Sequence, residues 1–255
     1  MRWPGKAIPV LLVIAGLAIA GLLPLDGLSP WNTAISETSG ERSSTAAENR
    51  QQNADMRSSP VGGDLPRPSG NFDFWLLALS WSPSYCAAEG ANASRRQCGR
   101  DGPSGFVVHG LWPQYEGGGF PSDCPSSEPG RISQQTYARI SDLIPTIGLA
   151  GHQWRKHGAC SGLSQADYFR TTRAAFRKLR LPKNLAGGAV SPANAEEAFV
   201  QLNPGLRPDS LAVTCDRRFL REVRICLDKD LNFIKCPAVD RRGCRMTAPL
   251  MPNKN

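Results

Sequence analysis

Two of the chain's three histidines lie in one short segment that also contains a lysine and a glutamine. The segment reads His152-Gln153-Trp154-Arg155-Lys156-His157-Gly158. In an α-helix, which turns by about 100° per residue, the two histidines, the lysine and the glutamine would share one face. The spacing therefore predicts a surface on which two imidazoles, an ammonium group and an amide converge. A solvated polar face of a helix would show the same pattern.

The third histidine, His109, follows the apolar run Phe106-Val107-Val108 and precedes Gly110-Leu111-Trp112-Pro113. Aromatic and β-branched residues favour a strand, so we expect a strand that ends at this histidine and leads into a turn. The end of a strand is a common position for a functional side chain. A histidine that is hydrogen-bonded inside the core is the alternative.

Imidazoles, with a pKa near ~6.5, suit general acid–base catalysis close to neutral pH, and a nearby cation would stabilise negative charge in a transition state. A zinc-protease site does not fit, because it needs a closer pair of histidines with a glutamate between them. Position 153 is Gln, so we expect no metal and no other cofactor. RNA supplies a phosphodiester and an internal nucleophile, the 2′-hydroxyl. DNA lacks that hydroxyl and should not be cleaved.

Strand patterns are found on both sides of these segments. The expected strands are residues 72–81, residues 106–108 and the alternating segment 222–227, which could form a hairpin with residues 232–236.

Helix signals occur between the strands. Ser164 and Asp167 resemble a capping box, which would open a helix that Pro182 ends, and Ser191 followed by Pro192 starts another. Strands and helices do not alternate regularly. The sequence therefore predicts an α+β fold in which helices pack on an antiparallel sheet.

All eight cysteines follow residue 70. An even number of cysteines behind an export signal indicates disulfides rather than free thiols. Zinc is the competing interpretation, but the chain has no C-x-x-C pair. We expect a domain stabilised by disulfides, and the spacing alone leaves their pairing open.

The N-terminal part differs in composition from the rest. Residues 1–25 have a cationic start and an uncharged apolar run, which is typical of a signal peptide or of an uncleaved membrane anchor. Residues 26–70 are rich in small polar residues, so we expect a flexible linker. Residues 71–255 would form the folded domain, secreted or periplasmic and monomeric. They carry the whole net charge of +8, which suggests an anionic partner.

The segments around the histidines resemble the ribonuclease T2 family. Residues 106–113 are similar to the first active-site segment of that family, and residues 152–160 to the second, which usually reads His-Glu-x-x-Lys-His-Gly followed closely by Cys. The likeness extends over roughly residues 72–237. Two such segments in the right order are far more specific than either alone.

The resemblance implies an endoribonuclease that cleaves single-stranded RNA to 2′,3′-cyclic phosphates and then to 3′-phosphates. By position, His157 would be the general base and His109 the general acid. His152 would hold the phosphate, and Lys156 would stabilise the charge of the transition state. Trp112 would stack on a base, with core packing as the alternative. The family also implies the disulfides Cys124–Cys160, Cys226–Cys236, Cys215–Cys244 and Cys86–Cys98.

Gln153 departs from the family pattern, because it stands where a glutamate is usual. An amide can still donate hydrogen bonds to a phosphoryl oxygen. It lacks the negative charge that would raise the pKa of neighbouring histidines. We expect an active enzyme with an altered rate or pH optimum. The alternative is a secreted RNA- or polyanion-binding protein in which this residue impairs catalysis.

Four arginines recur at helical spacing further along the chain and could attract an RNA backbone. They are Arg170, Arg173, Arg177 and Arg180. A solvated face of an amphipathic helix is the more common origin of such a stripe.

Overall fold

The structure is a computed structural model that describes residue 65 and residues 70–254. The signal peptide or anchor expected at 1–25 lies outside these residues, as does the linker expected at 26–70 apart from Leu65 and Gly70. Leu65 packs against the hydrophobic core, and the Gly70 N–H donates to the carbonyl of Ser161 at 2.8 Å. These two residues are therefore part of the packed domain. No helix within the described ranges is both long and apolar enough to cross a bilayer.

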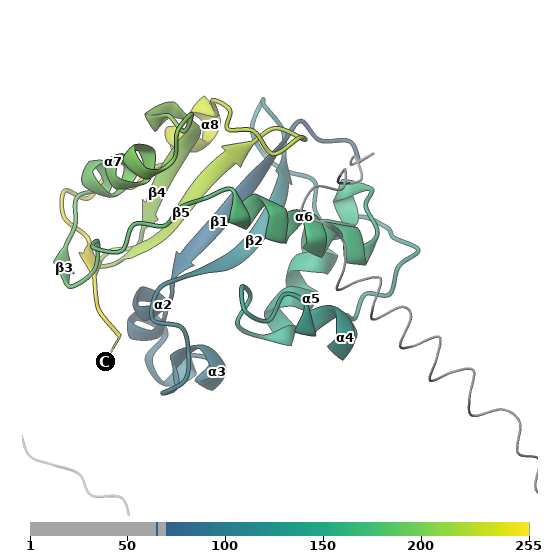
Figure 1. The fold of residues 1–255 in the computed structure, drawn as a ribbon, viewed down its shortest axis with the longest axis horizontal. Coiled ribbons are helices and arrows are strands. Elements are labelled where there is room, and N and C mark those ends of the chain that lie inside the picture. The colour runs from purple at the N-terminus through teal and green to yellow at the C-terminus, as the bar shows by residue number, and fades with distance from the viewer. Residues whose placement is uncertain (1–64, 66–69, 255) are drawn as a thin grey trace, which may run out of the picture. The chain divides into compact units, whose positions relative to one another are not determined.

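A four-stranded antiparallel sheet in the order β2-β1-β5-β4 forms the centre of the domain (Figure 1). Its strands are β1 (Phe74–Trp81), β2 (Phe106–Gln114), β4 (Leu211–Cys215) and β5 (Leu220–Leu227). The short strands β3 (Gly188–Ala189) and β6 (Leu250–Met251) pair separately. The predicted strands at 72–81 and 222–227 are confirmed as β1 and β5.

The hairpin partner predicted for β5 forms only in part. β5 pairs with β1 on one side and with β4 on the other. Residues 232–236 return antiparallel to the end of β5 through one bridge, between Leu227 and Phe233. The Asp228 N–H also donates to the carbonyl of Asn232 at 2.8 Å, and the Ile234 N–H to that of Cys226 at 3.2 Å. The Asp228 carboxylate accepts hydrogen bonds from the N–H groups of Asp230 and Asn232. These bonds fold the connection into a compact turn, so a regular ladder does not form after it.

Helices surround the sheet (Figure 1). They are α2 (Ser82–Glu89), α3 (Arg95–Cys98), α4 (Gln134–Ala138), α5 (Ile147–Lys156), α6 (Gln165–Arg177), α7 (Pro192–Leu202) and α8 (Pro237–Asp240). Together with the antiparallel sheet they confirm the predicted α+β class.

The predicted start of α6 is confirmed, because the Ser164 hydroxyl accepts from the N–H of Asp167 at 3.2 Å. Only this half of the capping box forms, since the Asp167 carboxylate pairs with Arg170. The helix ends at Arg177, before Pro182 is reached. The side chain of buried Asn203 bonds both the N–H and the carbonyl of Arg180, which holds that segment outside a helix.

The start predicted for α7 is also confirmed. The Ser191 hydroxyl accepts from the N–H of Asn194 at 3.1 Å, and Pro192 is the first helical residue.

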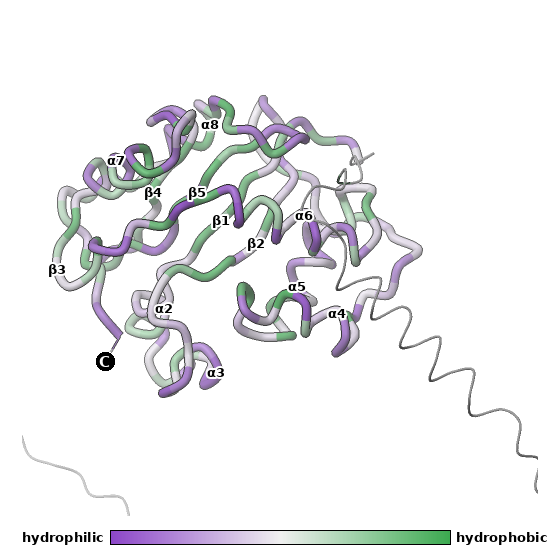
Figure 2. Tube along the Cα trace, viewed as in Figure 1, coloured by the Kyte–Doolittle hydropathy of each residue, from purple (hydrophilic) through white to green (hydrophobic). Residues whose placement is uncertain are grey.

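The two faces of the sheet have different surroundings. On one face, Trp75, Leu77 and Leu79 of β1 belong to the main core, to which α6 and α7 also contribute. On the other face, Phe74, Leu76 and Ala78 belong to a smaller cluster that includes Trp112 and the Cys226–Cys236 pair. Hydrophobic residues follow the paths of the central strands in Figure 2. The second face also carries the side chains described below.

The structure contains the four disulfides that the family resemblance implies. They are Cys86–Cys98, Cys124–Cys160, Cys215–Cys244 and Cys226–Cys236. Cys160 lies in the turn that follows α5, so the Cys124–Cys160 bond ties a distant loop to the end of that helix.

Candidate active site

His109 lies in the middle of β2 rather than at the end of a strand, which corrects the expected boundary. In the β1–β2 pairing, Ala78 faces Gly110 and Leu79 faces Val108. His109 is therefore the extra residue of a β-bulge, a feature that re-aims a side chain. The glycine and proline that follow suggested a turn in the sequence, but β1 pairs with both and extends the strand.

The ring of His109 is hydrogen-bonded to a carboxylate from another strand. Its Nδ1 lies 2.5 Å from Oε1 of Glu222 on β5, and Oε2 of Glu222 accepts from Nε of Arg224 at 2.9 Å. Burial by itself would raise the pKa of Glu222, but the hydrogen bond and charge of His109, together with those of Arg224, lower it to about 2. Glu222 is thus an anion at neutral and mildly acidic pH, so His109 donates the hydrogen from Nδ1.

The end of α5 places His157 just outside the helix. The helix stops at Lys156, and His157 has φ −127° and ψ −49° before a 3₁₀ turn begins. Gly158 explains the close turn: a Cβ there would lie 2.6 Å from the ring of Trp154 and 2.8 Å from that of Tyr168. Only glycine fits at this position without displacing aromatic side chains.

The prediction that four side chains share one helical face is correct only in part. Gln153 and His157 are buried, the Lys156 side chain is 36 % exposed, and His152 is exposed without a hydrogen bond among the described residues. The irregular backbone at His157 turns this ring inward, whereas His152 stays on the solvent side of α5. His152 is still close enough for its charge to act on His157.

His157 is a buried histidine surrounded by positive charge. It is 6 % exposed, and its Nδ1 has no hydrogen-bond partner in the described part of the chain. Burial lowers the pKa of His157 most strongly, and the charges of Lys156, His109 and His152 lower it further, to about 4, against a smaller opposite effect of Asp123. His157 is therefore neutral above that pH and able to accept a proton.

Trp112 brings the sheet and the helix end together. Its ring centroid is 5.1 Å from that of His109 and 5.2 Å from that of His157. Its Nε1 donates to Oε1 of Gln153 at 2.6 Å, and the guanidinium of Arg224 lies 5.5 Å from its ring. Trp112 is only 9 % exposed. The indole therefore fixes the relative positions of the two histidines.

Gly110 makes room for the contact between Trp112 and Gln153. A Cβ at position 110 would lie 2.2 Å from Oε1 of Gln153 and 2.3 Å from Nε1 of Trp112. An indole N–H only donates, so the amide oxygen must face it. The Gln153 amide nitrogen then keeps both hydrogens without a partner among the described residues.

Lys156 is paired with a carboxylate. Its Nζ lies 3.4 Å from Oδ2 of Asp123, whose side chain is 67 % exposed. The N–H of Asp123 also donates to the carbonyl of Lys156 at 3.0 Å, and the adjacent Cys124–Cys160 bond joins the same two segments. A bound phosphate would compete with Asp123 for the ammonium group.

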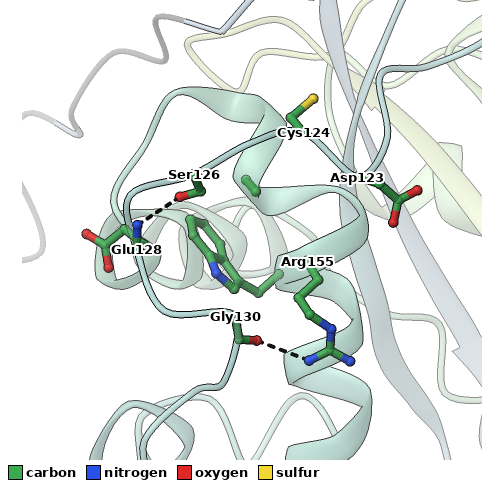
Figure 3. A pocket seen from close by; sticks show the side chains of 8 residues that line it. Asp123, Cys124, Ser126, Glu128, Gly130 and Arg155 are labelled. Carbon is green, nitrogen blue, oxygen red and sulfur yellow. Dashed lines mark hydrogen bonds between the residues drawn. The ribbon is translucent and has the colours of Figure 1, made fainter.

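A separate pocket of about 290 Å³ is lined by Asp123 and Cys124, among others (Figure 3). Trp154 and Arg155 line it, and Arg155 donates to the carbonyl of Gly130 at 3.1 Å. No histidine lines this pocket, so it offers no acid–base chemistry of the kind expected.

The arginine stripe is not a continuous unpaired surface. Arg170 pairs with Asp167, and Arg173 pairs with Asp142. Because α6 ends at Arg177, Arg180 lies beyond the helix.

Two residues at the site escaped the sequence analysis. Glu222 occupies a polar position of an alternating strand, which suggests only a solvated face. Phe120 is 45 % exposed, and its ring centroid lies 5.4 Å from that of His157. A lone aromatic residue after three glycines was the available signal for it.

Within residues 65 and 70–254, no group of three or more His, Cys, Asp or Glu side chains is arranged to hold a metal ion. The expectation of a metal-free site stays a prediction.

Comparisons with known proteins agree with this geometry. Residues 72–236 match the model of the ribonuclease T2 family. A ribonuclease from Aeromonas hydrophila is 39 % identical over 170 residues, which cover 64 % of this chain and 74 % of the relative. A probable ribonuclease from Haemophilus influenzae is 30 % identical over 194 residues, or 71 % of this chain and 66 % of the relative.

The fold is also similar to solved structures. Trichomaglin, described as a novel S-like ribonuclease, superposes with a TM-score of 0.59 at 24 % identity, over 72 % of this chain and all of that one. An RNase-related protein from Calystegia sepium gives a TM-score of 0.57 at 24 % identity, over 72 % of this chain and 98 % of that chain. With a family match over most of its folded part, the chain belongs to the ribonuclease T2 family.

Proposed function

We propose that this T2-type ribonuclease cleaves single-stranded RNA without a metal, by attack of the 2′-hydroxyl on the adjacent phosphate. The bond from phosphorus to O2′ forms and the bond to the 5′-oxygen breaks, which leaves a 2′,3′-cyclic phosphate. Water then opens the cyclic phosphate to a 3′-phosphate. Family membership supports the ribonuclease activity, and the geometry of the site supports the chemistry.

One observation carries the proposal: two histidines with opposite electrostatic surroundings contact the same indole ring. Burial, together with the charges of Lys156, His109 and His152, lowers the pKa of His157 to about 4 and keeps the ring neutral. His109 donates from Nδ1 to the ionised Glu222. Environments that separate two titratable groups in this way indicate which is the base and which the acid. His157 would take the proton of the 2′-hydroxyl, and His109 would protonate the departing 5′-oxygen.

The other side chains would bind and stabilise the phosphate. Lys156 supplies a cation once it leaves Asp123, and the free N–H groups of Gln153 can donate to a phosphoryl oxygen. His152, on the solvent side, would contact the phosphate from outside. Hydrogen bonds and charge placed where the transition state develops negative charge often provide the largest part of catalysis.

A base would stack on Phe120, whose exposed ring lies beside His157. Trp112, the platform expected from the family, offers little free surface because it is 9 % exposed. We propose that Trp112 forms the inner edge of the base site and Phe120 its accessible face. Stacking on an aromatic side chain contributes about 1–3 kcal/mol per base.

The expected location is outside the cytoplasm, secreted or periplasmic. The four disulfides support this, since such bonds persist mainly in oxidising compartments.

The test compares RNA with the same RNA carrying 2′-O-methyl groups, both in a chelator, with the disulfides intact. We expect cleavage of the unmodified RNA alone, with 2′,3′-cyclic or 3′-phosphate ends. Cleavage of the methylated RNA, or loss of activity in chelator, would contradict the mechanism. Binding without cleavage from mildly acidic to neutral pH would favour the alternative, an RNA-binding protein impaired by Gln153.

A further inference from the structure

Glu222 is a buried ionisable group whose contribution to the steps above has not been stated. Its side chain is 10 % exposed. It occupies β5, while its partner His109 occupies β2, and β1 runs between these strands. Within the sheet register, Glu222 pairs with Ser80 of β1. A buried carboxylate is costly unless it is paired and hydrogen-bonded, so its placement at this site calls for a function.

The surface of β1 allows the two side chains to meet. On this face β1 presents Ala78 and Ser80, which are small, and the Ser80 hydroxyl donates to Oε1 of Glu222 at 3.4 Å. The bulge brings His109 to the same face. No large side chain of β1 therefore separates the imidazole from the carboxylate.

The second oxygen of Glu222 is held independently. Arg224 donates to Oε2 from Nε at 2.9 Å, and its terminal nitrogen lies 2.8 Å from the same oxygen. Arg224 also contacts the ring of Trp112, which itself touches both histidines. The carboxylate is thus fixed at one end by a guanidinium, and Oε1 is aimed at His109.

We propose that Glu222 is a positioning residue for the general acid: it holds His109 in the tautomer with hydrogen on Nδ1 and directs Nε2 to the leaving 5′-oxygen. Arg224 positions Glu222 in turn. This role rests on the proposed function, because it assigns Glu222 to the protonation of the leaving group.

The test uses two substrates that differ only in the leaving group. One is a dinucleoside phosphate, whose 5′-oxygen must be protonated as it departs. The other is the nucleoside 3′-(4-nitrophenyl phosphate) with the same base, whose leaving group departs without a proton. A residue that acts through the general acid should matter for the first substrate and little for the second.

For Glu222→Ala we expect kcat on the dinucleoside phosphate to fall about 10–100-fold, as is typical when an orienting partner is lost. On the nitrophenyl substrate the loss should be under about threefold. Glu222→Gln can still accept from Nδ1, so it should recover part of the rate.

Charged, polar and aromatic groups surround the pair of His109 and Glu222. Arg224 and the Ser80 hydroxyl face Glu222, while Trp112 lies beside His109 and His157 acts on it by charge. Glu196→Gln is the matched control, since Glu196 is a partly buried carboxylate that accepts from the N–H of Val213. It should leave the ratio of the two rates unchanged.

Equal losses on both substrates, with no recovery of the rate in Glu222→Gln, would overturn the proposal and leave Glu222 with a structural role alone. If Glu222→Ala unfolds, the nearly isosteric Glu222→Gln carries the same test, with thermal unfolding as the check. Failure of the unsubstituted protein to cleave either substrate would instead contradict the proposed function. The two failures are therefore distinguishable.

Discussion

The two histidines that contact Trp112 come from unlike parts of the molecule. His109 projects from a β-bulge and is 35 % exposed, with a carboxylate on Nδ1. His157 follows the last residue of α5, is 6 % exposed, and has no hydrogen bond on Nδ1 within the described ranges. The sheet supplies an anion to one ring, and the helix end supplies cations and burial to the other. In the proposed mechanism, these surroundings prepare one residue type for two opposite proton transfers.

This difference determines how easily a substitution can alter the environment of each histidine. The environment of His109 depends on one directional contact across three strands, so a single substitution removes it. The environment of His157 is the sum of burial and several charges, so no one substitution should abolish it.

Removal of either ring is the largest expected effect. His157→Ala and His109→Ala should each lower kcat/KM on RNA by about 10²–10⁴-fold, the usual contribution of general acid–base catalysis. The nitrophenyl substrate should restore most of the rate to His109→Ala and little of it to His157→Ala. Steady-state kinetics on both substrates measures this. Recovery by His157→Ala instead would show that the acid and base roles are reversed.

Gly110→Ala should have an intermediate effect, because it displaces the Trp112 indole, which contacts both histidines. The added methyl would overlap Gln153 Oε1 and Trp112 Nε1. Overpacking of this kind costs about 1–3 kcal/mol, and we expect at least a tenfold loss of activity. Urea unfolding and kcat/KM provide the measurements. Gly117→Ala is the control, since a Cβ there meets nothing within 4 Å; similar losses in both variants would contradict the explanation.

Gln153→Glu should have the smallest effect. It tests the electrostatic difference between the surroundings of His157 and those of His109. A carboxylate one helical turn before His157 favours the protonated ring, so the neutral base is lost earlier as pH falls. The acid limb of kcat/KM, near pH 4 in the unsubstituted protein from the lowered pKa of His157, should move up by about half to one unit. The rate should change a few-fold. Gln153→Ala adds no charge and should leave the limb in place; an unchanged rate and profile in Gln153→Glu would mean that position 153 has no catalytic influence.

Local patterns in the sequence predicted the parts that local interactions determine. The caps at Ser164 and Ser191 form as expected, because each hydroxyl bonds an N–H three residues away. The alternation at 222–227 correctly predicted β5. The disulfide pairs and the individual roles of the histidines came from resemblance, because spacing cannot determine which distant residues meet.

Long-range contacts account for what the sequence did not reveal. Glu222 lies 113 residues after His109, and only the strand order places them together. The end of α6 depends on Asn203, which belongs to a later segment. The continuation of β2 past His109 depends on pairing with β1, which outweighs the turn preference of the glycine and proline. In each case tertiary pairing overrides a local preference.

The bulge at His109 also has a genetic consequence. Val108 is fixed in the main core on one side of the sheet, and Trp112 is fixed on the other side. The number of residues between them decides which way His109 faces, since a shift by one residue exchanges the two faces of a strand. Loss or gain of one codon between these positions should therefore be as damaging as loss of the histidine codon itself. Between Val108 and Trp112, evolution should therefore tolerate substitutions far more readily than insertions or deletions.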